Sequence, residues 1–126
     1  MKKISYSAVV LTEDSHAKLV NKYGHLIPEG WKFFAHHMTI VFGKGLPNEV
    51  KQQEGDTVEL KVTHIGLNKR VVAFKVDGFP SANEVPHITF AVNVTEGAKP
   101  VESNDISEWV DIVPFNVEGV VTEIPK

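Results

Sequence analysis

Cysteine is absent from the 126-residue chain, and its absence excludes several kinds of chemistry. Without a thiol the protein can form no disulfide, use no cysteine nucleophile and build no zinc site on cysteine ligands. A chain of this kind is compatible with a reducing compartment, and we expect a cytoplasmic location.

Long apolar runs are also missing. The apolar stretch Ala8–Leu11 follows a charged N-terminus, as the core of a signal peptide does, but it is too short and leads directly into Thr12–Asp14. No run approaches the length of a membrane span. We therefore expect no membrane association and interpret Ile4–Leu11 as a first strand.

The chain has no excess of positive charge. The chain contains 13 Lys and Arg residues and 16 Asp and Glu residues, which gives a net charge of −3. A long nucleic-acid footprint requires a basic face, so we expect a small or short phosphate-bearing ligand instead. The length and the ordinary hydrophobic content predict one domain over residues 1–126, and nothing in the sequence sets an oligomeric state.

Against these absences, one tripeptide pattern occurs twice, as His37-Met38-Thr39 and as His87-Ile88-Thr89. Both copies lie in apolar runs typical of strands. Because strand side chains alternate between two faces, each His shares a face with its Thr, and the residue between them points into the core. Two such strands side by side would direct two imidazoles and two hydroxyls into one cleft, a set suited to acid–base chemistry on a phosphodiester.

The remaining pattern predicts an α+β fold with one clear helix and one short helix. Alternating runs predict further strands at 58–66, 71–76 and 117–124, and a helix capped by Asp14 or Ser15 should run to Tyr23, where Gly24 ends it. A second, short helix is expected to start at Ser103 or Asn104 and end near Val110. We expect mostly antiparallel sheets in two lobes, with the cleft between the two His-x-Thr strands.

The two motifs and their flanks, Ala35–Ile40 and Val85–Phe90, resemble the two-histidine (2H) phosphoesterase superfamily. That superfamily includes RNA 2′,3′-cyclic phosphodiesterases and the cyclic phosphodiesterase domains of tRNA ligases. Together with Lys99-Pro100 and Ser103-Asn104, the flanks look most like small phage-type members, among them anti-CBASS nucleases that cleave cyclic oligonucleotides, and like RNA-repair relatives. The resemblance implies a bilobed fold, metal-independent hydrolysis without a cofactor and, for a phage protein, the host cytoplasm.

The chain also departs from larger members of the superfamily. These carry a helix before the second motif strand, whereas only residues 78–86 separate that strand from the preceding one here. We therefore expect a trimmed second lobe and a more open cleft.

If the resemblance holds, one of His37 and His87 is the general base and the other the general acid, in an order that the sequence leaves open. Thr39 and Thr89 would bind the phosphate oxygens. Weaker substrate-binding candidates are Tyr6, Lys99, Ser103 and Asn104. No His-x-His or His-Glu-x-x-His motif indicates a metal site.

Other histidines and aromatic residues are interpreted as structural. Strand alternation places His36 on the face opposite His37, while His16 and His25 look like surface residues of the first helix and its exit. Trp31, Phe34 and Trp109 are candidates for stacking a base, but large aromatic residues are more often part of a core.

Two other readings compete with the enzyme. A binding module could hold a nucleotide or an RNA end without turnover, although it would not need two imidazoles. In a structural domain the motifs would be coincidental, and nucleotides would not stabilise the fold.

Overall fold

The computed structural model describes residues 3–125, in which seven strands form one antiparallel sheet. The order along the sheet is β2-β6-β3-β1-β7-β4-β5, and a further pairing of β5 with β6 closes it on itself. The strands are β1 (Ile4–Leu11), β2 (Lys32–Phe33), β3 (His37–Phe42), β4 (Thr57–Leu67), β5 (Val71–Asp77), β6 (His87–Val92) and β7 (Trp109–Pro125). The α+β fold with mostly antiparallel pairing is confirmed.

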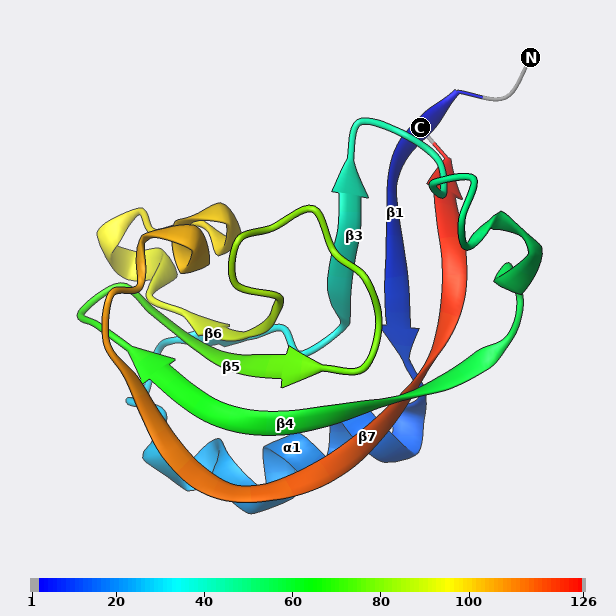
Figure 1. Ribbon diagram of the computed structural model, residues 1–126. Helices are drawn as coiled ribbons and strands as arrows, with labels where there is room; N and C mark the ends of the chain where they lie inside the picture. Colours follow the sequence, from blue (N-terminus) through cyan, green and yellow to red (C-terminus); the bar gives the residue numbers. More distant parts are fainter. Residues whose placement is uncertain (1–2, 126) are drawn as a thin grey trace.

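The closed sheet has two parts, which β4 and β7 join (Figure 1). β1 and β3 stand nearly upright in this view, β5 and β6 lie across it, and the long strands β4 and β7 curve through both parts. Each motif strand therefore belongs to a different part, as expected for two lobes.

The bend in β7 coincides with an irregularity in its pairing with β4. Val62 pairs with Phe115 but His64 pairs with Asp111, so residues 112–114 of β7 lie opposite Thr63 alone. Such a bulge increases the local twist and tolerates Pro114, which cannot donate a ladder hydrogen bond. It lets one strand pass from one lobe to the other.

Helix α1 (Glu13–Tyr23) follows β1 and packs across the bend of β7. Its N-cap is Thr12, whose hydroxyl accepts a hydrogen bond from the Ser15 amide, so the cap lies before the predicted Asp14 or Ser15. Ser15 is instead buried, and its hydroxyl accepts a hydrogen bond from the Glu118 amide. Gly24 keeps a right-handed conformation, and the chain continues as a 3-10 turn over Gly24–Leu26.

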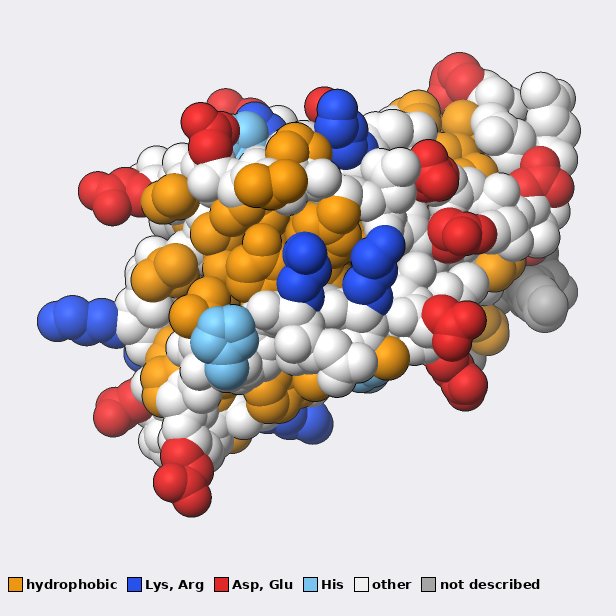
Figure 2. Space-filling view, turned by 90° about the horizontal axis from the view of Figure 1, so that it is seen from below, with side chains coloured by type: hydrophobic (Ala, Val, Ile, Leu, Met, Phe, Trp, Pro, Cys, Tyr) orange, Lys and Arg blue, Asp and Glu red, His pale blue; other side chains and the backbone are white. Residues whose placement is uncertain are grey.

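Aromatic rings fasten α1 to the sheet. Tyr23 packs on Phe74 and stacks on Phe115, and the ammonium groups of Lys18 and Lys22 lie over the Phe115 ring. Figure 2 shows the face seen from below, on which side chains of the Lys and Arg class lie beside a gathering of apolar side chains. No helix in the described part of the chain is long and apolar enough to cross a membrane.

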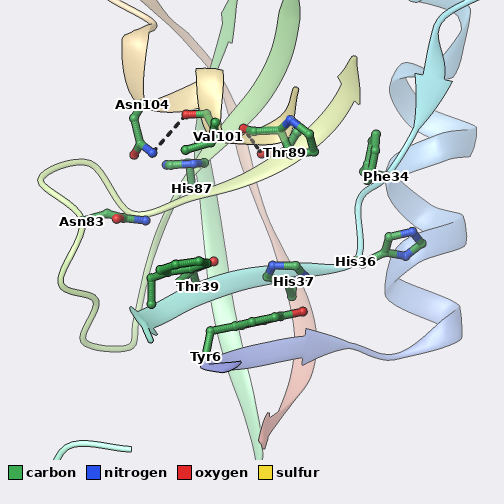
Figure 3. A pocket seen from close by; sticks show the side chains of 12 residues that line it. Tyr6, Phe34, His36, His37, Thr39, Asn83, His87, Thr89, Val101 and Asn104 are labelled. Atoms are coloured by element: carbon green, nitrogen blue, oxygen red, sulfur yellow. Dashed lines mark hydrogen bonds between the residues drawn. The ribbon is translucent and has the colours of Figure 1, made fainter. Parts of the chain in front are cut away.

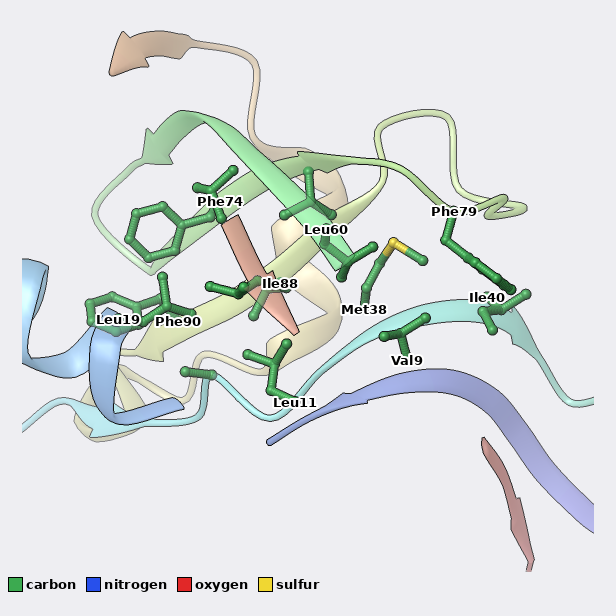
Figure 4. Packing of buried hydrophobic residues seen from close by; sticks show 14 of the residues in the cluster. Val9, Leu11, Leu19, Met38, Ile40, Leu60, Phe74, Phe79, Ile88 and Phe90 are labelled. Carbon is green, nitrogen blue, oxygen red and sulfur yellow. The ribbon is translucent and has the colours of Figure 1, made fainter. Parts of the chain in front are cut away.

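The core fills the inside of the closed sheet. Met38 and Ile88, the middle residues of the two motifs, are both fully buried there, as the alternation predicted (Figure 4). Phe74 and Phe90 pack edge to face at 5.0 Å between ring centroids. The His and Thr residues on either side of Met38 and Ile88 therefore point out of the core.

The predicted second helix is wrong in type and position. A 3-10 helix spans Pro100–Asp105, with Ser103 and Asn104 inside it, and Trp109 already belongs to β7. The residues near 109 pair with the far end of β4. A free strand edge thus outweighs the capping signals that predicted a helix.

Candidate active site

The two motif strands, β3 and β6, meet at one pair of residues, Met38 and Ile88. Because the strands are antiparallel, the residues flanking this pair are opposed in reverse order. His37 consequently lies across from Thr89, and Thr39 lies across from His87, as Figure 3 shows. Each imidazole thus faces a hydroxyl of the other motif.

A pocket of about 300 Å³ opens between these strands. It is lined by Tyr6, Phe34, His36, His37, Thr39, Phe42, Asn83, His87, Thr89, Pro100, Val101 and Asn104. All four motif side chains line it, together with two of the weaker candidates, Tyr6 and Asn104. Among the described lining residues there is no lysine, arginine, aspartate or glutamate.

His87 is held in a defined orientation. Its side chain is buried, and ring atom Nδ1 lies 2.8 Å from the carbonyl oxygen of Val85. A carbonyl can only accept, so Nδ1 carries the proton of this hydrogen bond. Nε2 is then the ring atom that can exchange a proton with a ligand.

His37 has a different environment. Its ring packs against Tyr6 at 5.1 Å between centroids. Burial lowers the pKa of His37 below its usual value, and the nearby imidazoles of His36 and His87 lower it further. At neutral pH His37 is therefore mainly in its neutral form, which can take up a proton.

The two motif threonines differ in how their hydroxyls are held. Thr89 Oγ1 lies 2.8 Å from the Ser103 hydroxyl and 3.3 Å from the carbonyl oxygen of Pro100, to which it can donate. Ser103 is only 1% exposed and does not line the pocket, so it supports Thr89 from behind. The Thr39 hydroxyl has no hydrogen-bond partner among residues 3–125, although the Thr39 carbonyl accepts from Ser81 Oγ at 2.8 Å.

The segment 78–86 connects β5 to β6. Beyond Met38, β3 no longer pairs with β6, and this segment follows its edge instead, with the Ala82 amide donating to the Ile40 carbonyl. The Ser81 hydroxyl also accepts from the Asn83 amide at 3.2 Å. These hydrogen bonds position Asn83 at the pocket. No motif in the sequence indicates that Asn83 lines the site.

Lys99 is not among the pocket-lining residues. Its backbone amide donates to Glu102 Oε2 at 2.7 Å, and Glu102 in turn forms an ion pair with Arg70 on the β4–β5 turn. These contacts hold the 3-10 helix over Thr89. Lys99 therefore lies outside the pocket, and its backbone helps to hold this helix in place.

His36 lines the pocket next to His37, contrary to the expectation that it faces the other way. The reason is Ala35, whose φ of 54° lies in the left-handed region. Strand alternation does not hold across such a residue, and β3 begins only at His37. Alanine carries no sequence signal for this conformation, which glycine or asparagine would have suggested.

His16 is not simply a surface residue either. It is half-buried, its Nδ1 lies 2.9 Å from the Ala35 carbonyl oxygen, and its ring stacks on that of His36. His25 is exposed, as expected. Of the three aromatic candidates, Phe34 lines the pocket, whereas Trp31 and Trp109 pack against the buried clusters.

Phe42 at the end of β3 is 82% exposed and forms part of the pocket wall. The loop after it contributes no lining residue. Leu46 and Val50 of this loop are buried in the core, and the Leu46 amide donates to Glu123 on β7. The loop is therefore packed against the sheet.

Within the described residues, no group of three or more histidine, aspartate or glutamate side chains is placed to hold a metal ion. The site contains the imidazoles and hydroxyls of the two motifs, and the rings of Tyr6, Phe34, His36 and Phe42 form part of its wall. This arrangement can deliver and remove protons on opposite sides of one phosphate while hydroxyls bind its oxygens.

Comparison with known proteins identifies a family for this chain. The model of a family described as the fungal tRNA ligase phosphodiesterase domain matches residues 9–121, a span that contains both motifs. No curated protein matches the chain. Since the match extends over most of the 126 residues, the chain belongs to the fungal tRNA ligase phosphodiesterase domain family, a branch of the 2H phosphoesterase superfamily, and this membership implies phosphodiesterase activity.

Proposed function

We propose that the protein hydrolyses a nucleotide-derived phosphodiester by two-histidine acid–base catalysis, and that its substrate is an RNA end carrying a 2′,3′-cyclic phosphate. The observation that carries the proposal is the Met38–Ile88 pairing, which sets one His and one Thr on each side of a single pocket. The family supports a substrate at an RNA end.

In this proposal His37 is the general base and His87 the general acid. The lowered pKa of His37 supplies a neutral imidazole that takes a proton from water. The water oxygen bonds to phosphorus, the bond from phosphorus to one ribose oxygen breaks, and that oxygen takes the proton from Nε2 of His87. The product is a phosphomonoester with a free neighbouring hydroxyl, and exchange with solvent resets both histidines.

Thr39 and Thr89 bind the non-bridging oxygens in this scheme. Charge on these oxygens grows as water attacks, so a hydroxyl donor stabilises the transition state more than the ground state. A cyclic phosphodiester carries a single negative charge, which agrees with a lining that has no lysine or arginine among the described residues.

The test is an assay in chelator-treated buffer with three substrates: a short RNA with a 2′,3′-cyclic end, 3′,3′-cyclic GMP-AMP and a cyclic trinucleotide. We expect cleavage of the RNA end, and loss of roughly 10²-fold or more in rate for His37→Ala and for His87→Ala. His25→Ala, an exposed histidine outside the pocket, is the matched control.

The other outcomes identify the competing functions. Preference for a cyclic oligonucleotide would replace RNA repair with the degradation of a signalling nucleotide, as a phage counter-defence protein requires. Binding of the RNA end without turnover, weakened by the same substitutions, would identify a binding module. An unchanged rate in His37→Ala would exclude His37 as the base.

A further inference from the structure

Two aromatic rings form a corner at one end of the pocket. Phe34 and His36 both line it, with ring centroids 6.1 Å apart and planes at 76°. Figure 3 shows both side chains on the α1 side of His37, away from Asn83 and His87. This corner therefore lies beyond the proposed position of the phosphate, on the side of His37, the proposed general base.

Contacts within the protein hold the corner in place before any ligand binds. The His16 ring lies parallel to the His36 ring within 3°, at 5.4 Å between centroids, and His16 is itself held by the Ala35 carbonyl. The amides of Phe34 and Ala35 donate to the carbonyls of Phe90 and Thr89 at 2.7 and 2.8 Å. The corner is thus fixed to the second motif strand, and little ordering is needed when a flat group enters it.

The chemistry of the corner is suited to an aromatic ligand rather than to an anion. Burial and the neighbouring His16 and Lys32 lower the pKa of His36, so its imidazole is neutral at neutral pH. The Lys32 ammonium lies over the Phe34 ring at 5.2 Å, where it is engaged with that ring. Neutral aromatic faces bind nucleobases by stacking, with little dependence on which base is present.

We propose that Phe34 and His36 form a nucleobase subsite, which receives the base of the nucleoside that carries the cyclic phosphate. This inference rests on the proposed function and deepens it. The substrate must then carry a base next to the phosphate, and a sugar cyclic phosphate without a base would be a poor ligand. His16 acts as a positioning residue that holds the His36 ring in place.

The test compares two ligands by equilibrium titration in a His87→Asn background, which prevents turnover: adenosine 2′,3′-cyclic phosphate and the base-free 1-O-methylribose 2,3-cyclic phosphate. We expect His36→Ala and Phe34→Leu each to weaken binding of the adenosine ligand about tenfold or more, as for loss of one stacked base. Binding of the base-free ligand should not change.

Two further variants separate stacking from general damage. His36→Phe keeps a ring and should restore most of the affinity, while His25→Ala should have no effect on either ligand. Phe34→Leu keeps apolar contact with the buried cluster that contains Val71 and Val92, so we expect the variant to fold.

The inference is overturned if His36→Ala and Phe34→Leu weaken the binding of both ligands equally. It is also overturned if they do not weaken the binding of the adenosine ligand. These results are independent of hydrolysis. If the base-dependent loss appears but wild-type protein cleaves no substrate, the subsite stands and the proposed function fails. If wild type cleaves the RNA end but the loss does not depend on the base, the function stands and the subsite fails.

Discussion

At the scale of single residues, the two halves of the site differ in their support although their motifs match. The Thr89 hydroxyl forms a hydrogen bond of 2.8 Å with the Ser103 hydroxyl, whereas the Thr39 hydroxyl has no hydrogen-bond partner in the described chain. Ser103 is buried and touches the pocket only through Thr89. We therefore interpret it as a positioning residue, which sets the direction of the Thr89 hydroxyl.

Ser103→Ala should lower kcat by roughly 3- to 10-fold, the equivalent of one hydrogen bond of about 1 kcal/mol, with little change in KM. Thr89→Ala should lower kcat further, because it removes the hydroxyl that is proposed to bind the phosphate. The measurement is steady-state kinetics on an RNA end with a 2′,3′-cyclic phosphate. Ser103→Thr, which keeps the hydroxyl, should recover part of the rate; equal losses in both Ser103 variants would indicate a packing role instead.

At the scale of elements, regular alternation allowed most strands to be predicted and failed where tertiary pairing decides the structure. The strands around His37 and His87 alternate over a buried face, so their faces could be assigned from the sequence. The first half of β7 contains Asp111 and Pro114 and is half exposed, and it forms a strand because β4 offers a partner edge. The position of His36 depends on the left-handed Ala35, and that of Asn83 on hydrogen bonds from residues 81 and 82 to β3.

The contact between β1 and β7 gives an element-scale prediction at Gly119. A Cβ atom there would lie 2.5 Å from Val9 Cγ1 and 2.9 Å from the Val10 carbonyl oxygen, so the two strands would have to separate. Gly119→Ala should therefore destabilise the protein by about 1–3 kcal/mol, as overpacking of a core does. Urea denaturation measures the change.

Gly24→Ala is the matched control for this prediction. Gly24 has right-handed dihedrals, and its nearest neighbour to a new Cβ is Val20 Cγ1 at 3.5 Å, an ordinary contact. Replacing it should stabilise the protein by roughly 0.4–1 kcal/mol, because alanine loses less conformational freedom on folding. If Gly119→Ala were as stable as wild type, β1 and β7 would not be as closely packed as the structure shows.

At the scale of the whole molecule, closing the sheet through β5 and β6 brings the two motif strands together and buries part of the His37 and His87 side chains. The pKa values of His36 and His37 are both lowered, chiefly by burial. In the unfolded chain each titrates near the usual value of about 6.5. Between that value and the lowered one, the unfolded state binds more protons than the folded state, so the free energy of unfolding rises with pH.

Acidification from pH 7 to about pH 5 should therefore lower the melting temperature, and a His36→Gln/His37→Gln variant should show a weaker dependence over the same range. This window lies above the usual titration range of Asp and Glu, whose protonation destabilises proteins at lower pH. The measurement is thermal unfolding at a series of pH values and constant ionic strength, with His25→Gln as the exposed control. If the melting temperature falls as steeply with decreasing pH in the double variant as in wild type, other groups cause the acid sensitivity. The two imidazoles would then not be desolvated in the folded protein. A weaker slope would show that the neutral imidazole proposed for His37 costs the fold stability in acid, which links the active site to the stability of the closed sheet.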